Sequence, residues 1–176
     1  MLSLIVVGMF MSCHSDNDNW ETYKEWRNAN AAWLERQADS TVNGKLYYES
    51  VRPEYDKGQY IYMHWFNDRN ATKNNLQPYY TSTVDVKYIG YLYNGEPFDS
   101  SYNNTATYGD SLFRTSLRNV ISGWAIALQE MHVGDSVEVI IPYQSAYGIS
   151  GYGSIDPYSN LKFRIKLVDI PAWEIK

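Results

Sequence analysis

Residues able to act as nucleophiles or metal ligands are few in this sequence, and they follow none of the spacings that such chemistry needs. The three histidines, His14, His64 and His132, lie far apart and match no metal-ligand spacing. The sequence contains no Gly-x-Ser-x-Gly nucleophile elbow and no phosphate-binding loop of the Walker type. We therefore expect no metal, no cofactor and no covalent catalysis.

The single cysteine, Cys13, follows a short apolar run and precedes a polar stretch. Residues 2–11 are apolar but too few to cross a bilayer, which is typical of the hydrophobic part of a signal peptide. This run, followed by Ser12 and Cys13, resembles a bacterial lipobox, in which the cysteine is lipidated after cleavage. Residues 1–12 would then be a lipoprotein signal peptide and residues 13–18 a tether. The alternative is a buried cysteine on an N-terminal core segment.

The lipobox resemblance also predicts a location. It implies a chain held by lipid alone in the cell envelope of a Gram-negative bacterium, on the outer membrane facing the periplasm or the surface. No other stretch of the sequence approaches the roughly 18 apolar residues of a membrane-spanning helix. A disulfide within the chain is excluded because there is one cysteine.

Composition narrows the function classes. The chain has 176 residues, enough for one domain, and a net charge of −5 with a pI near 5.1. This charge argues against general nucleic-acid binding, which needs a basic face to neutralise phosphates. The 17 tyrosines and six tryptophans suit half-buried strands and binding clefts. The same aromatic residues could instead form a surface that binds glycans, which is a weaker alternative.

The first half of the chain is predicted to form a helix followed by two strands. Aromatic residues recur at spacings of three and four within residues 19–38, which predicts an amphipathic helix that packs on the rest of the domain or on a partner. Residues 45–51 and 59–66 are rich in Tyr, Val and Ile and are predicted strands. Residues 67–77 are polar and loop-like. We assign residues 19–83 to a helix and strand extension.

The second half shows clearer patterns. Alternating apolar residues from position 84 predict a half-buried strand, and Asn94-Gly95 predicts a turn after it. Residues 120–131 are apolar enough for one short helix, while 135–142 and 160–170 are two further predicted strands. Together these elements indicate an α+β fold, with an antiparallel sheet and one short helix against it. The long stretch 143–160 between the last two strands is predicted to be a functional loop.

Several ordered blocks in residues 84–170 resemble the FKBP-type peptidyl-prolyl cis-trans isomerases. The main blocks are Val84-x-Val86-x-Tyr88-x-Gly90, Gly95-x-Pro97-Phe98-Asp99-Ser100-Ser101, Val120-Ile121-x-Gly123-Trp124, Ala146-Tyr147-Gly148 and Leu161-x-Phe163. The resemblance implies a curved antiparallel sheet wrapped around the short helix, and an isomerase domain over residues 84–176. With Cys13, it points to lipoprotein members of the family from Gram-negative, Bacteroides-like bacteria.

The resemblance also assigns the site. It makes Trp124 the floor of a proline pocket, and it gives the Ile121 N–H and the Tyr147 hydroxyl as donors to bound peptide. Asp99 would orient Tyr88 or polarise the amide. The implied catalytic residues are Tyr88, Phe98, Asp99, Trp124, Tyr147 and Phe163. The implied substrate-binding residues are Val120, Ile121, Ile155 and Phe113.

One position in this site stays open at the sequence level. The segment between Phe98 and Val120 is a few residues longer than is usual in the family, so its register is ambiguous. Phe113 is the expected wall residue, but Leu112 or Leu117 could fill the same space.

The expected activity is acceleration of X-Pro bond rotation in exported proteins. Rotation faces a barrier of about 18–20 kcal/mol because the planar amide is resonance-stabilised. The twisted amide is less polar along its C–N bond, so a dry aromatic pocket favours it without a cofactor. The resemblance implies X-Pro polypeptides as partners and macrolides as inhibitors, and it leaves the oligomeric state open. The alternative is a chaperone or assembly module that binds proline peptides with little turnover.

Overall fold

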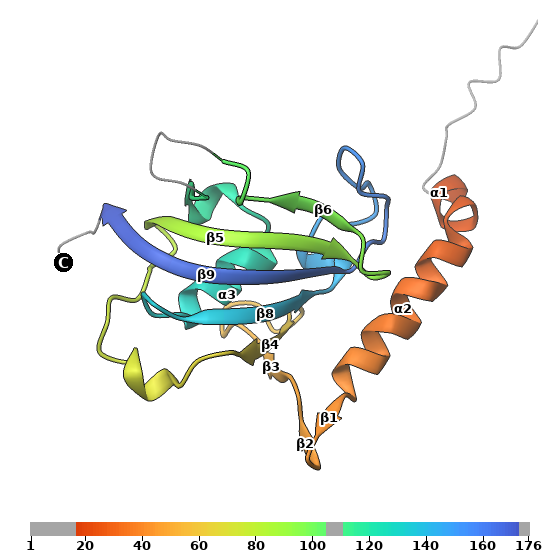
Figure 1. The fold of residues 1–176 in the computed structure, drawn as a ribbon. Helices are drawn as coiled ribbons and strands as arrows, with labels where there is room; N and C mark the ends of the chain where they lie inside the picture. The colour runs from red at the N-terminus through yellow and green to blue at the C-terminus, as the bar shows by residue number, and fades with distance from the viewer. Residues whose placement is uncertain (1–16, 105–110, 173–176) are drawn as a thin grey trace, which may run out of the picture.

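A computed structural model describes residues 17–104 and 111–172 (Figure 1). Cys13 and the apolar run before it lie outside the described residues, so the signal peptide and the lipid anchor stay predictions. No helix in the described ranges is long and apolar enough to cross a membrane.

The core element is a curved antiparallel sheet with α3 (Ser122–Glu130) packed on one face (Figure 1). Neighbouring strands in it are antiparallel throughout. β7 (Phe113–Ser116) pairs with β5 outside the main order. The main order is β3 (Glu49–Val51), β4 (Ile61–Trp65), β8 (Ser136–Ile141), β9 (Leu161–Ala172), β5 (Thr83–Leu92) and β6 (Pro97–Ser100). The predicted α+β class, with a sheet around one short helix, is confirmed.

Strand β5 forms because its side chains alternate between two environments. Val84, Val86 and Tyr88 are buried against α3, as the period of two in the sequence predicts. The strand then turns at Asn94-Gly95 into β6. Gly95 adopts a positive φ of 86°, a conformation in which a residue without a Cβ is favoured. The predicted strand and turn are both confirmed.

Helix α3 lies unusually close to the sheet because it carries Gly123. A Cβ at this position would lie 2.3 Å from Cγ2 of Ile141 on β8, which is too close for any real side chain. The helix buries Trp124, Ala127 and Leu128 in the main core. This close packing brings the first turn of α3 under β5 and β9, where Trp124 meets the sheet.

The extension begins with helices α1 (Asn17–Thr22) and α2 (Lys24–Ala38), which cover the predicted helix with one interruption near Tyr23. A short hairpin follows, made of β1 (Thr41–Val42) and β2 (Lys45–Leu46). The predicted strand 45–51 is therefore split between β2 and β3. The split occurs at Tyr47, whose N–H donates to the Ser40 carbonyl at 2.8 Å and so turns the chain from the hairpin towards the main sheet.

Three short 3₁₀ turns complete the fold, and the first of them lies in the polar segment after β4. They are η1 (Arg69–Ala71), η2 (Leu117–Asn119) and η3 (Tyr143–Ser145). The carboxylate of buried Asp135 accepts hydrogen bonds from Asn67 Nδ2 at 2.9 Å and from Thr72 Oγ1 at 2.5 Å. These bonds hold the predicted loop 67–77 against the start of β8.

Helix α2 packs on the domain itself and supports the long loop 143–160. Trp26 Nε1 donates to Ser159 Oγ at 3.1 Å. Buried Asn30 accepts the Asn160 N–H through Oδ1 at 2.8 Å, and its carbonyl accepts from Asn160 Nδ2 at 2.8 Å. Asn160 Oδ1 in turn accepts the Tyr143 N–H at 2.9 Å. The C-terminal end of the loop and its first turn are thus tied to the extension.

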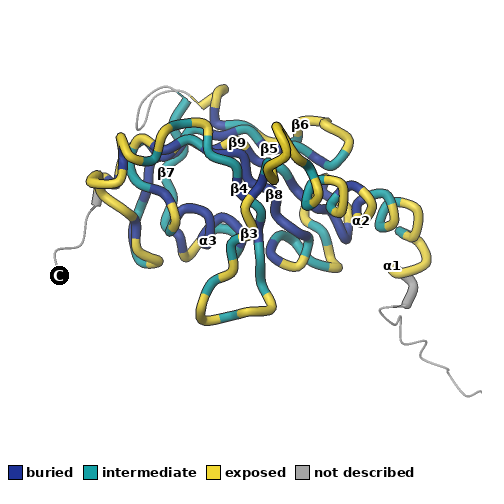
Figure 2. Tube along the Cα trace, turned by 90° about the horizontal axis from the view of Figure 1, so that it is seen from below, coloured by how far each residue is buried: buried dark blue, intermediate teal, exposed yellow. Residues whose placement is uncertain are grey.

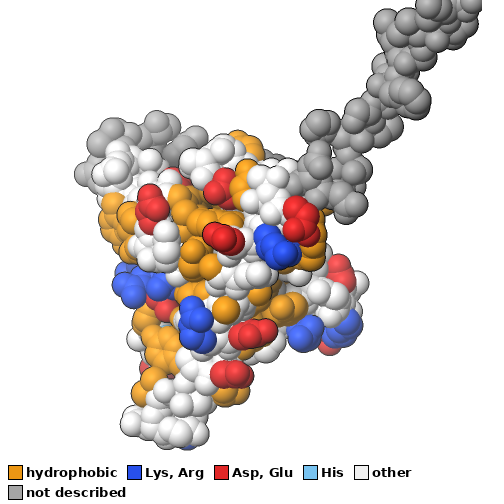
Figure 3. Space-filling view, turned by 90° about the vertical axis from the view of Figure 1, so that its right-hand side faces the viewer, with side chains coloured by type: hydrophobic (Ala, Val, Ile, Leu, Met, Phe, Trp, Pro, Cys, Tyr) orange, Lys and Arg blue, Asp and Glu red, His pale blue; other side chains and the backbone are white. Residues whose placement is uncertain are grey.

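The visible surface carries charges of both signs. On the face shown in Figure 3, acidic and basic side chains are interspersed among hydrophobic ones, and basic residues do not gather into one patch there. The face shown therefore lacks the basic stripe that is typical of a nucleic-acid-binding surface.

We expect Asn30→Ala to lower the free energy of unfolding by about 2 kcal/mol, because it leaves the buried Asn160 N–H without its acceptor. Urea unfolding followed by tryptophan fluorescence measures this loss. Asn28→Ala is the matched control, since Asn28 lies on the same helix and is exposed. Equal stability of the two variants would contradict the role given to the Asn30–Asn160 contact.

Candidate active site

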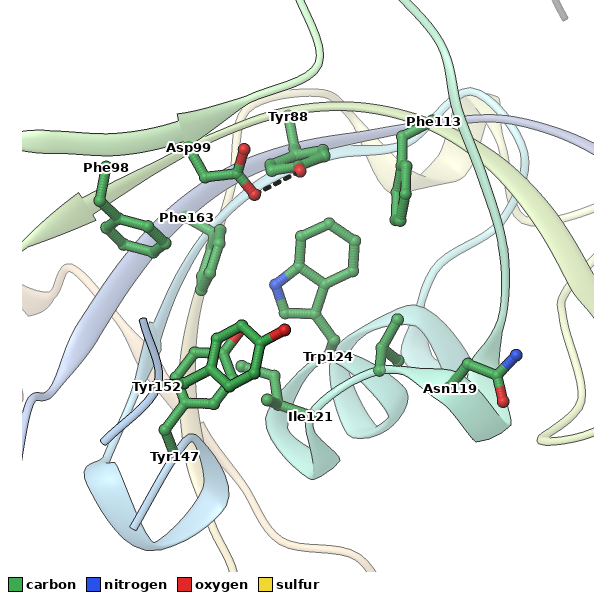
Figure 4. Close-up of a pocket in the computed structure, with 11 residues that line it drawn as sticks. Tyr88, Phe98, Asp99, Phe113, Asn119, Ile121, Trp124, Tyr147, Tyr152 and Phe163 are labelled. Carbon is green, nitrogen blue, oxygen red and sulfur yellow. Dashed lines mark hydrogen bonds between the residues drawn. The ribbon is translucent and has the colours of Figure 1, made fainter. Parts of the chain in front are cut away.

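A cavity of about 350 Å³ opens between β5, β6, the start of α3 and the loop 143–160 (Figure 4). This volume lies within the usual range for small-ligand sites. The lining is mostly aromatic and contains one carboxylate and one amide. It consists of Tyr88, Phe98, Asp99, Phe113, Asn119, Val120, Ile121, Trp124, Tyr147, Tyr152 and Phe163.

The floor of the cavity is the indole of Trp124, which is 4% exposed. Its ring stands edge-on to Tyr88 and Phe163, with centroid separations of 4.9 Å and 5.2 Å, and to Phe113 at 6.5 Å. Figure 4 shows the indole between Phe163 and Phe113, with Tyr88 above it. Such edge-to-face contacts are favourable, and they fix the indole as a rigid apolar base.

The aromatic rings of Phe98 and Phe163 can form part of the cavity wall because β5 has a glycine at the point where both rings lie over it. Gly90 pairs with Phe163 on β9 and with Asp99 on β6. A Cβ on Gly90 would lie 2.7 Å from both Phe163 Cε1 and Phe98 Cζ. The rings of Phe98 and Phe163 can therefore stack edge to face over bare backbone, with centroids 5.5 Å apart.

Asp99 acts on Tyr88. The Tyr88 hydroxyl donates to Asp99 Oδ2 at 2.6 Å, the bond drawn dashed in Figure 4. Asp99 Oδ1 accepts the Ser100 N–H at 2.8 Å. Burial of the phenol, followed by its bond to Asp99, raises the pKa of Tyr88 well above its usual value, so the hydroxyl stays a donor. With both oxygens engaged, this geometry favours the orienting role of Asp99 over polarisation of an amide.

Tyr147 forms the opposite wall, just beyond η3 on the long loop. Its ring stacks on that of Tyr152, with centroids 5.1 Å apart and planes within 13°. Burial, with smaller contributions from Asp99 and Tyr152, raises the pKa of the Tyr147 hydroxyl, so this group also stays protonated. Tyr152 is 70% exposed and covers the outer side of Tyr147 at the mouth of the cavity.

The second donor expected from the sequence is the Ile121 N–H. Ile121 caps α3, and its carbonyl accepts the N–H groups of Trp124 at 3.0 Å and Ala125 at 3.2 Å. Its own N–H donates to no acceptor among residues 17–104 and 111–172. Because Ile121 lines the cavity beside the indole, this N–H is available to a carbonyl bound there.

The structure places Phe113 at the wall position that the sequence left open. Phe113 lines the cavity, whereas Leu112 does not. Leu117 is fully buried and lines a second cavity on the other side of Val120. Phe113 reaches the wall because β7 pairs Phe113 with Val86, two residues from Tyr88 on β5.

Ile155 is the one predicted site residue that the structure does not bring to the cavity wall. It is 6% exposed, belongs to the main core and does not line the cavity. Mutual backbone hydrogen bonds with Tyr152, at 2.9 Å and 2.8 Å, turn the chain here. Tyr152 faces the mouth, and Ile155 faces inward beneath it.

Two lining residues were not assigned from the sequence, namely Asn119 and Tyr152. Tyr152 was detectable in principle, because it is an aromatic residue in a Gly-rich loop that carries Tyr147. Asn119 ends η2 directly before Val120, and the sequence contains no signal that a polar residue at this point faces a cavity.

The arrangement is suited to binding a small apolar ring. The floor and most of the walls are hydrocarbon, while the Tyr147 hydroxyl and the Ile121 N–H are donors at the rim. No cluster of three or more potential metal ligands occurs in the described parts of the chain.

Comparison with known proteins shows which family this chain resembles. Residues 75–168, more than half of the chain, match the FKBP-type peptidyl-prolyl cis-trans isomerase family. The chain is 45% identical over 86 residues to FK506-binding protein 4 of Dictyostelium discoideum, covering 48% of this chain and 22% of that protein. It is 40% identical over 91 residues to the isomerase FkpA of Escherichia coli K12, covering 51% and 32%. The chain thus spans less than half the length of these relatives.

Solved structures extend the likeness to most of the fold. A peptidyl-prolyl cis-trans isomerase from Pseudomonas syringae matches with a TM-score of 0.63 and 27% identity, covering 84% of this chain and 94% of that one. The crystal structure of FkpA from Escherichia coli matches with a TM-score of 0.59 and 27% identity, covering 88% and 60%. This chain therefore belongs to the FKBP-type peptidyl-prolyl cis-trans isomerase family.

Proposed function

We propose that this chain accelerates cis-trans rotation about X-Pro bonds of polypeptides. The observation that carries the proposal is the cavity floored by Trp124, with the Ile121 N–H and the Tyr147 hydroxyl at its rim. A proline ring fits the apolar floor, and the two donors suit the carbonyls on either side of it.

The catalytic effect follows from the polarity of the cavity. The planar amide shares charge between its oxygen and nitrogen, and rotation removes this resonance. Aromatic walls solvate the less polar, twisted amide better than the planar one. Only interactions that strengthen on twisting raise the rate. Lowering the barrier by about 8 kcal/mol corresponds to about a 10⁶-fold acceleration.

Macrolide inhibitors are the second ligand class that we expect in this cavity. The support is its aromatic lining and the name of one relative, FK506-binding protein 4. Competition between such a macrolide and an X-Pro peptide would place both in the same cavity.

The setting that we propose is the envelope of a Gram-negative bacterium, with Cys13 lipidated and exported polypeptides as substrates. The support is the apolar run 2–11 followed by Ser12 and Cys13. Slow X-Pro exchange, which takes about 10–100 s without a catalyst, limits the folding of such substrates.

We expect the full-length chain, expressed in a Gram-negative host, to incorporate labelled palmitate and to partition into the detergent phase. Cys13→Ser removes the thiol that would carry the lipid, so it should abolish both signals. Wild-type chain that stays unlabelled would contradict the anchor and leave the isomerase proposal intact.

We expect Tyr147→Phe to lower kcat/KM on an X-Pro peptide by about tenfold, because it removes one donor to the bound peptide. A protease-coupled isomerisation assay measures this change. Tyr143→Phe is the matched control, since Tyr143 lies on the same loop and does not line the cavity.

The same assay separates the enzyme from the binding module. Peptide binding by wild-type protein without turnover would support a docking function and contradict the proposal. Equal activity of the Tyr147 and Tyr143 variants would exclude the donor role of Tyr147.

We expect Gly90→Ala to lower kcat/KM by about tenfold or more, because its Cβ displaces the rings of Phe98 and Phe163. Lys87→Ala on the same strand should have little effect, since its side chain lies on the opposite face of β5. Circular dichroism checks that both variants fold. A folded Gly90→Ala variant with wild-type kcat/KM would show that the positions of these two rings do not matter.

A further inference from the structure

A second cavity, of about 480 Å³, lies on the other side of Val120 from the indole cavity. We call it the flanking groove. Val120 lines both cavities, so they are neighbours along the chain segment that leads into α3. The groove is lined by Tyr55, Gln59, Tyr80, Leu117, Val120, Ser122, Ala125 and Gln129.

The groove is built by two parts of the chain. One wall is a face of α3, where Ser122, Ala125 and Gln129 follow each other at spacings of three and four. The other wall comes from the extension, through the loop between β3 and β4 and through Tyr80. Figure 2 shows this loop projecting past α3 on the helix side of the sheet. The groove therefore lies where the β3–β4 loop and Tyr80 pack beside α3.

The lining of the groove is uncharged and includes two exposed aromatic rings. Tyr55 is 71% exposed and Tyr80 is 52% exposed. Rings exposed to this extent beside a cavity gain apolar contacts when a ligand covers them. An uncharged lining of this type favours a neutral apolar or aromatic group over a charged one.

The groove also contains an acceptor that lacks a partner. Gln59 Nε2 donates to Asp56 Oδ2 at 3.0 Å, which fixes the orientation of the Gln59 amide. Gln59 Oε1 is buried and accepts no hydrogen bond within the described residues. A buried oxygen without a partner is costly, so binding that turns the Gln59 amide towards an N–H of the bound chain would relieve this cost. A polypeptide supplies both an N–H and an apolar side chain.

We propose that the flanking groove binds a neutral apolar or aromatic residue next to the X-Pro bond of a polypeptide substrate. This inference rests on the proposed function. The bound segment runs from the indole cavity across Val120, close to the Ile121 N–H, into the groove. The preferred substrates are then X-Pro segments in apolar stretches, such as those exposed in unfolded polypeptides.

The test compares the full chain on three peptides. A short peptide carries Ala-Pro alone, a long peptide adds aromatic residues on both sides, and a third carries Glu in place of these aromatic residues. We expect kcat/KM to be about tenfold higher on the aromatic peptide than on the other two, as burial of one apolar side chain predicts. Tyr55→Ala combined with Tyr80→Ala should remove this advantage and leave the short peptide unaffected.

Tyr79→Ala is the matched control, because Tyr79 precedes Tyr80, is 50% exposed and does not line the groove. It should keep the advantage of the aromatic peptide. Three outcomes overturn the inference: equal kcat/KM of wild-type protein on all three peptides, retention of the advantage in the double variant, or its equal loss in Tyr79→Ala.

Failure of the proposed function gives a different pattern. Wild-type protein that turns over none of the three peptides would contradict isomerase activity. The groove is then tested by the affinities of the same peptides, followed by tryptophan fluorescence. Tighter binding of the aromatic peptide that the double variant loses supports the groove, and equal affinities for all three peptides overturn it.

Discussion

The site depends on one constraint, which is that the indole of Trp124 must be buried in the core and still form the floor of a cavity. The rings of Tyr88, Phe113 and Phe163 meet this constraint by contacting the indole edge-on from β5, β7 and β9. Two glycines allow these contacts. Gly123 lets α3 approach β8 closely, and Gly90 lets the rings of Phe98 and Phe163 lie directly over β5. Added volume at either glycine would be transmitted to the cavity, because protein interiors are close-packed.

The extension also fixes the position of one wall of the cavity, the loop 143–160. A loop as long as 143–160 would lose much conformational freedom on ordering. Here α2 holds its C-terminal end, through the bond from Trp26 to Ser159 and the contacts of Asn30 with Asn160, and Asn160 Oδ1 ties its first turn by accepting the Tyr143 N–H. Tyr147 and Tyr152 lie between these fixed points and stack on each other. The helix thus restricts the loop before any ligand binds, which lowers the entropic cost of binding.

The sequence predicted elements whose pattern is local and missed features that depend on packing. Alternation in β5, the Asn94-Gly95 turn and the apolar run of α3 have local causes. The strands β6 and β7 are short edge strands whose pairing with β5 decides their conformation, so their own residues gave little signal. Ile155 and Tyr152 show the same limit. Both lie in one irregular turn, and only the backbone geometry decides which of them faces the cavity.

The flanking groove illustrates why the extension could not be interpreted from its own sequence. Tyr55 and Tyr80 are far apart in the chain, and neither belongs to a periodic pattern that predicts a shared surface. Their common property is a position beside one face of α3, whose first turn also carries the indole. Binding energy from contacts remote from the rotating bond can be used to hold that bond in the cavity. In the proposed function, the extension therefore contributes to substrate binding on both sides of the N-terminal end of α3, through the loop that carries Tyr147 and through the groove beyond Val120.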